Sequence, residues 1–150
     1  MEIQTQIIPI YHEIGHWMIA NALGYEGYIT GDIKDNKDFR FVQTSAIKNS
    51  IQGLKNQILI AFGGLGAEKI LDIPLNFGHI GDLNIACKHL KELSSLENKA
   101  FEFKNYLDFP EKEYDYYLNQ SQLVLNQIGG KNAILKYGKE VYNKMLDKIN

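Results

Sequence analysis

Residues 8–23 of the chain read IPIYHEIGHWMIANAL, and this stretch organises the fold. Its apolar side chains fall on nearly all sides of a helical projection, which is the pattern of a helix buried among other elements. We therefore expect a buried helix from about Ile8 to Leu23, with Gly24 as its stop signal.

The same stretch contains the pentapeptide HEIGH at positions 12–16. On a helix, His12 and His16 share one face and can both bind one Zn²⁺, while Glu13 can hold the attacking water. The alternative is a charged stripe on a surface helix. The apolar flanks argue against it, because buried polar groups without partners are costly. Gly15 inside the helix costs about 1 kcal/mol relative to alanine, which indicates that another group, for example a second backbone, approaches closely there.

Length and composition are those of an ordinary globular chain, and 150 residues suit a single domain. A net charge of −2 with scattered lysines gives no basic face for nucleic acid. No stretch approaches the ~20 apolar residues of a membrane span. Cys87 is the only cysteine, which fits a reducing compartment. The N-terminus shows no signal peptide pattern, so we expect a cytoplasmic protein.

The next segments predict one small hairpin and a second helix. Residues 25–33 and 39–44 are rich in aromatic and β-branched side chains, and a polar turn at 34–38 separates them, as in a β-hairpin. A second helix is expected over 45–71. The run GGLGA at 63–67 either breaks this helix or allows tight contact, and we favour tight contact with the first helix.

The second half of the chain is expected to be helical. A loop over Asp72 to Gly81 precedes a third helix that begins at Asp82. Residues 92–150 are expected to form further helices with breaks at 108–110 and 129–130. The predicted fold class is therefore mostly α with a small β-hairpin (α+β), in one domain over residues 1–150.

A catalytic zinc normally takes three protein ligands, so the HExxH motif predicts a further His, Asp or Glu. The metzincin extension would need a histidine at Ala22 and is absent. Glu26 lies too close to the end of the same helix to fold back onto the metal. Taken alone, Asp82 fits a helix N-cap, and the two remaining histidines fit loop or surface positions. The candidates for the third ligand are Glu68, His79, Asp82 and His89.

Three separated motifs resemble the zinc peptidase domain of FtsH-type AAA+ proteases. That family has HEAGH on its first peptidase helix, GGxxAE on a second, and GxxxDL, whose aspartate is the third zinc ligand. This chain has HEIGH at 12–16, GGLGAE at 63–68 and GHIGDL at 78–83, in the same order. The resemblance covers the core motifs over 8–90, and a helical C-terminal part over 91–150 also fits.

By this resemblance, Asp82 is the third zinc ligand, and Glu68 is a packing residue or a partner of a ligand. The implied fold is an FtsH-peptidase-like helical zinc metalloprotease domain, for which an oligomer is possible. The chain departs from the family because it contains no GxxxxGK[ST] phosphate-binding loop. Only eleven residues precede His12, so we do not expect the ATPase and membrane domains of the family.

The expected function is that of a zinc-dependent metalloendopeptidase that hydrolyses extended or unfolded polypeptides without ATP. The two motif histidines and Asp82 bind Zn²⁺, Glu13 acts as the general base, and the substrate lies beside residues 39–44. A separate ATPase or an adaptor is an open possibility as a partner. One alternative is a zinc-binding regulatory or interaction module without turnover, which has no use for Glu13. Another is a different HExxH regulatory protease with Glu68 as third ligand.

Overall fold

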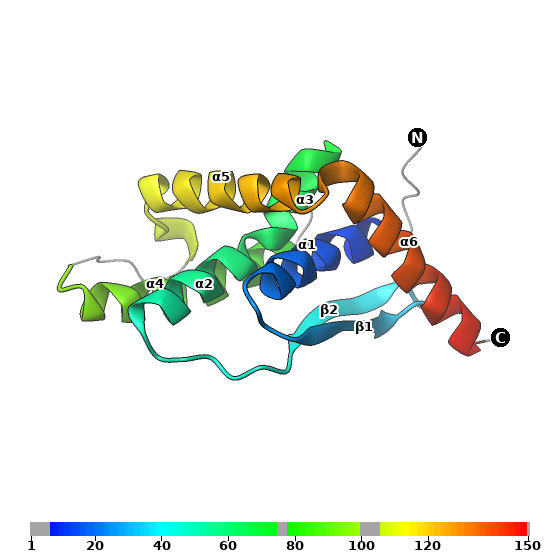
Figure 1. Cartoon of the computed structure of the whole chain (residues 1–150), viewed down its shortest axis with the longest axis horizontal. Coiled ribbons are helices and arrows are strands. Elements are labelled where there is room, and N and C mark those ends of the chain that lie inside the picture. The colour runs from blue at the N-terminus through cyan, green and yellow to red at the C-terminus, as the bar shows by residue number, and fades with distance from the viewer. Residues whose placement is uncertain (1–6, 75–77, 100–105, 150) are drawn as a thin grey trace.

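The computed structural model describes residues 7–74, 78–99 and 106–149 (Figure 1). These residues form mostly helices with a small two-stranded antiparallel sheet, which confirms the predicted α+β class. The elements are α1 (Ile8–Ala22), β1 (Gly27–Asp32), β2 (Lys37–Gln43), α2 (Ile51–Ala61), α3 (Gly63–Leu71), α4 (Gly78–Leu96), the short 3₁₀ helix η2 (Tyr106–Asp108), α5 (Glu111–Gln127) and α6 (Gly130–Ile149).

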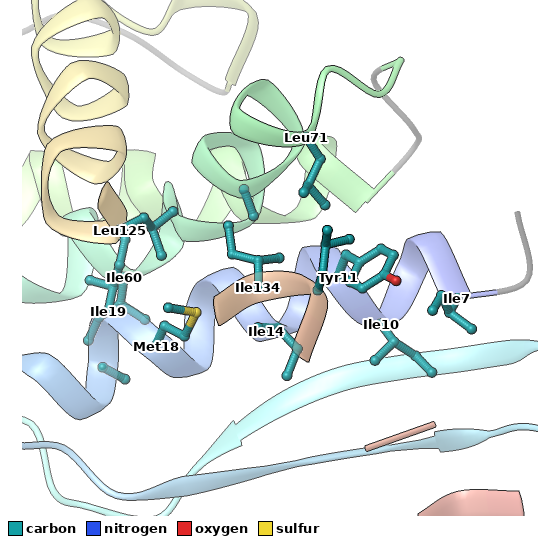
Figure 2. Packing of buried hydrophobic residues seen from close by; sticks show 13 residues of the cluster. Ile7, Ile10, Tyr11, Ile14, Met18, Ile19, Ile60, Leu71, Leu125 and Ile134 are labelled. Carbon is teal, nitrogen blue, oxygen red and sulfur yellow. The ribbon is translucent and has the colours of Figure 1, made fainter. Parts of the chain in front are cut away.

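Helix α1 lies at the centre and is in contact with α3, α6, α2, α5 and both strands. It is buried on most of its surface, as the sequence predicts. Figure 2 shows large apolar side chains from α1 packed against residues of α2, α3, α5 and α6. The fully buried members labelled there include Ile10, Tyr11, Ile14, Ile19, Leu125 and Ile134.

The predicted hairpin is confirmed, with β1 slightly shorter than the expected 25–33 and β2 beginning at Lys37, before the predicted start at residue 39. Its register pairs Gly27 with Gln43 and Ile29 with Phe41. Phe39 and Phe41 of β2 pack against the core around α1, together with Ile29 and other apolar side chains of the hairpin region. The sheet therefore lies along one side of α1, opposite α3 and α5 (Figure 1).

The helix expected over 45–71 is wrong as a single element. Helix α2 begins only at Ile51, where the Ser50 side chain accepts a hydrogen bond from the Gly53 amide at 3.0 Å. The helical segment is then interrupted at Phe62. The Phe62 side chain is fully buried and lies against an aromatic cluster from the second half of the chain. The glycine-rich run therefore both breaks the helix and allows the tight contact that we favoured.

That tight contact joins the backbones of α1 and α3. A Cβ atom added to Gly15 would overlap the Gly63 carbonyl and come within 2.8 Å of the Ala67 side chain. A Cβ atom added to Gly63 would lie 2.6 Å from the Gly15 carbonyl oxygen. Real Cβ contacts are essentially never shorter than 3.0 Å, so both positions require glycine. The prediction of a close neighbour at Gly15 is confirmed.

Helix α4 begins at Gly78, before the predicted start at Asp82. Asp82 therefore lies inside the helix and is not its N-cap. Residues 75–77 of the expected loop lie outside the described residues. The breaks predicted at 108–110 and 129–130 are confirmed, because α5 begins at Glu111 and α6 at Gly130.

Candidate metal centre

The two histidines of α1 are oriented by hydrogen bonds from their Nδ1 atoms. His12 Nδ1 lies 2.7 Å from Glu68 Oε1, and His16 Nδ1 lies 2.6 Å from the Ile60 carbonyl oxygen. Both partners are acceptors, so each Nδ1 carries the proton and donates it. Each Nε2 is thereby directed to the same point, and the two Nε2 atoms are 3.2 Å apart. Such anchoring is typical of histidines that bind a metal through the other ring nitrogen.

Asp82 on α4 completes the group. Its Oδ2 atom lies 2.6 Å from His12 Nε2 and 3.1 Å from His16 Nε2. The histidine side chains are 3% and 7% exposed and that of Asp82 is 17% exposed, so Asp82 is the most exposed of these three side chains. His12, His16 and Asp82 are close enough together to hold a metal ion.

The donor set fits a divalent cation of the zinc type. Two imidazole nitrogens and one carboxylate oxygen are ligands found in catalytic zinc sites, which keep a fourth position for water. Zinc bonds of about 2.0–2.1 Å in a tetrahedron put neighbouring ligand atoms about 3.3 Å apart. The two longer separations here, 3.2 and 3.1 Å, are close to that value, and the third is shorter. The same donors also suit ferrous iron.

The charges of the group are strongly coupled. Burial lowers the pKa of His12, but hydrogen bonds with Asp82 and Glu68 outweigh it and raise this pKa to about 10. Burial also lowers the pKa of His16, and the nearby Asp82 carboxylate more than compensates and raises it. Burial raises the pKa of Asp82, whereas the two histidines hold it well below its usual range. Protons and a cation therefore compete for the same Nε2 atoms.

Glu13 follows His12 on α1 and lies beside the group without joining it. Its Oε2 atom accepts a hydrogen bond from the backbone N–H of Phe41 on β2, at 2.8 Å. Burial is the main cause that raises the pKa of Glu13, and Asp82 also raises it, whereas the two histidines lower it. A carboxylate with a raised pKa beside a metal centre suits a general base.

The other third-ligand candidates are placed elsewhere. Glu68 is fully buried and contacts His12 through Nδ1, the nitrogen that faces away from Asp82. His89 lies further along α4, outside the cluster of possible ligands found among the described residues. Glu26 is exposed between α1 and β1. The side chain of His79 lies outside the described residues.

Three contributors to this site were not identified from the sequence. Two are backbone groups, the Ile60 carbonyl and the Phe41 amide, and no side-chain pattern marks them. The third is Gly64, because a Cβ atom there would overlap the imidazole ring of His12. Its signal was visible in the glycine-rich run at 63–67, which we assigned only to helix packing.

The break between α2 and α3 explains why the Ile60 carbonyl is available. In a continuous α-helix this carbonyl would accept the amide proton of Gly64, four residues later. The helix is interrupted at Phe62 instead, and the Ile60 carbonyl accepts the proton of His16 Nδ1. The interruption thus contributes directly to the orientation of a candidate metal ligand.

No protein-family model, curated protein or solved structure matches this chain. The resemblance to FtsH-type peptidases therefore rests on the three motifs. Among the described residues, no helix is both long enough and apolar enough to cross a membrane.

Proposed function

We propose that the chain is a zinc-dependent metalloendopeptidase, similar to the peptidase domain of FtsH-type proteases, that hydrolyses extended or unfolded polypeptides. The observation that carries this proposal is the convergence of His12 Nε2, His16 Nε2 and Asp82 Oδ2, with the Glu13 carboxylate beside them. A metal site with only a structural role has no need of the adjacent carboxylate. Amide hydrolysis needs a base at this place.

Each residue has a distinct role in the proposed reaction. His12, His16 and Asp82 would hold the ion, which when bound lowers the pKa of a water molecule and polarises the peptide carbonyl. Glu13 takes the proton of the attacking water and returns it to the leaving amine. Glu68 fixes the ring orientation of His12 through the 2.7 Å contact with Nδ1. The contact of Glu68 with this outer nitrogen supports Asp82 over Glu68 as the third ligand.

The substrate would lie along β2. This strand pairs with β1 on one edge, and the bond from the Phe41 amide to Glu13 brings its other edge to the candidate site. An extended peptide can add to such an edge through backbone hydrogen bonds. Backbone pairing selects for an extended conformation more than for particular side chains, so substrates without stable structure are expected.

The test is cleavage of casein or an unstructured fluorogenic peptide by the purified chain. Activity should disappear with a chelator and return with Zn²⁺, and it should not depend on ATP. Glu13→Gln should keep the metal and the fold but lose about 10²–10⁴-fold in kcat, because the amide cannot accept the proton. Glu26→Gln, at an exposed position, is the matched control and should remain active.

Three outcomes would contradict the proposal. A fully active Glu13→Gln protein would remove the assigned base, and activity that resists complete removal of metal would remove the assigned chemistry. A protein that binds Zn²⁺ tightly but cleaves no unfolded substrate would instead support the alternative of a zinc-binding interaction module. Metal analysis of the purified protein distinguishes zinc from iron.

A further inference from the structure

The hydrogen bond between Glu13 and β2 is the starting point, because it joins the proposed base to the strand proposed to bind substrate. Glu13 Oε2 accepts from the Phe41 N–H at 2.8 Å. Glu13 itself is partly buried. A backbone amide is a fixed donor, since the strand that carries it is held by pairing with β1 and by the packing of Phe41 against the core.

The register of the hairpin shows which way this amide points. Phe41 is opposite Ile29 on β1. In an antiparallel pair, successive residues direct their N–H and C=O groups alternately toward the partner strand and away from it. The Phe41 N–H is directed at Glu13, so its C=O is also on the outer edge of β2. The neighbouring groups of Val42 then face β1.

We propose that the Phe41 amide is a positioning group for Glu13 in the proposed peptidase reaction. The glutamate side chain has three rotatable bonds, and holding one oxygen on a fixed N–H removes most of that freedom. Oε2 is held by the strand, and Oε1 serves as the atom that takes the proton from water. This inference rests on the proposed function and assigns a role to a backbone group within it.

The assignment has a consequence for substrate binding. An added strand would normally use both the N–H and the C=O of the residue opposite it. Because the Phe41 N–H is engaged by Glu13, a substrate strand is left with the Phe41 C=O and with other groups along the edge. Loss of this N–H should therefore slow the chemical step and leave the binding of substrate nearly unchanged.

The experiment replaces only this N–H. Incorporation of phenyllactic acid at position 41 changes the amide to an ester and keeps the Phe41 side chain. We expect kcat to fall about 10–100-fold, in line with the loss of a hydrogen bond to a charged group. KM should stay within about twofold of the native value, since the contacts that bind the substrate before the reaction are kept. The zinc content should be unchanged.

The matched control is the same amide-to-ester change at Tyr28 on β1, which the register pairs with Val42 and whose N–H faces β2. It should weaken the sheet slightly but leave kcat close to that of the native chain. Should the ester variant at position 41 fail to fold, Phe41→Pro can be compared with Phe41→Ala. Proline removes the N–H that donates to Glu13 without removing a bond to β1, and alanine keeps that N–H.

The outcomes separate this inference from the proposed function. An ester variant at position 41 with native kcat, together with an inactive Glu13→Gln protein, overturns the positioning role and leaves the peptidase proposal intact. A higher KM with native kcat also overturns it, because the N–H then belongs to the substrate. An active Glu13→Gln protein overturns the proposed function itself.

Discussion

Two helix contacts in this molecule are built in opposite ways. Between α1 and α3 the backbones touch through Gly15 and Gly63, and the polar site residues lie on the same contact. Between α2 and α4 the contact is made by buried apolar side chains of one cluster, among them Leu54, Ile58, Cys87 and Leu90. The first contact places donor atoms with little room for adjustment, whereas the second supplies apolar burial.

The candidate metal centre depends on both contacts. His12, His16 and Glu68 come from the glycine contact, but Asp82 comes from α4. The apolar contact therefore has to hold α4 in place so that one carboxylate reaches two histidines. The difference suggests a division of roles in which one helix pair fixes geometry and the other contributes stability, and this can be tested at each contact.

The largest effect is expected at the candidate metal centre, where residues from both helix contacts come together. Asp82→Ala or His12→Ala should reduce the zinc content from about one ion per chain to background, because each removes one of three ligands. Glu68→Gln should weaken zinc binding only about 10–100-fold, as is typical of partners of ligands. Competition with a chromophoric chelator measures the affinities, and His89→Ala serves as the control. A greater loss for Glu68→Gln than for Asp82→Ala would exchange their roles.

A second prediction concerns the glycine contact. Gly15→Ala should lower the free energy of unfolding by about 3 kcal/mol or more, at the upper end of overpacking effects, because backbone atoms cannot move aside. Gly81→Ala is the control, since a Cβ atom there meets nothing within 4 Å and alanine is favoured in a helix by about 0.5–1 kcal/mol. Urea denaturation measures both. Equal stabilities for the two variants would refute the close contact.

The smallest effect is expected in the apolar contact. Ile58→Val removes one methylene group from a fully buried side chain and should cost about 0.5–1.5 kcal/mol. Because Ile58 holds no site residue directly, zinc affinity should stay within about twofold of the native value at temperatures where the variant is folded. A large loss of zinc affinity would show that the two contacts are not separable in this way.

The sequence predicts the parts of this site that depend on side-chain type. The buried helix, both motif histidines and Glu13 follow from HEIGH and its apolar flanks. Asp82 and the supporting place of Glu68 followed from the resemblance to FtsH-type peptidases, because the residues alone left several ligands open. In the structure, Asp82 lies beside Nε2 of both histidines, close enough for the three residues to hold a metal ion, and Glu68 contacts His12 Nδ1.

What the sequence does not predict depends on the backbone and on tertiary packing. The glycine-rich run left open whether the helix would break, and the position of the break at Phe62 accompanies the burial of its ring and the approach of α3 to α1, which local helix propensity does not specify. The early start of α4 removed the capping role considered for Asp82. The Ile60 carbonyl and the Phe41 amide are backbone groups of a kind that nearly every residue has. Only their positions in the folded chain distinguish them from other backbone groups.

The separation of the site residues along the chain also bears on the stability of the folded protein. His12 and Asp82 are 70 positions apart, so an ion held by both would close a long loop that exists only in the folded chain. A ligand that binds the native state alone shifts the folding equilibrium, by about 2.7 kcal/mol when it is present at a hundred times its Kd. The proposed cofactor would thus act as a reversible cross-link. In a cell that is short of metal, the chain would lose its activity and also become easier to unfold and degrade.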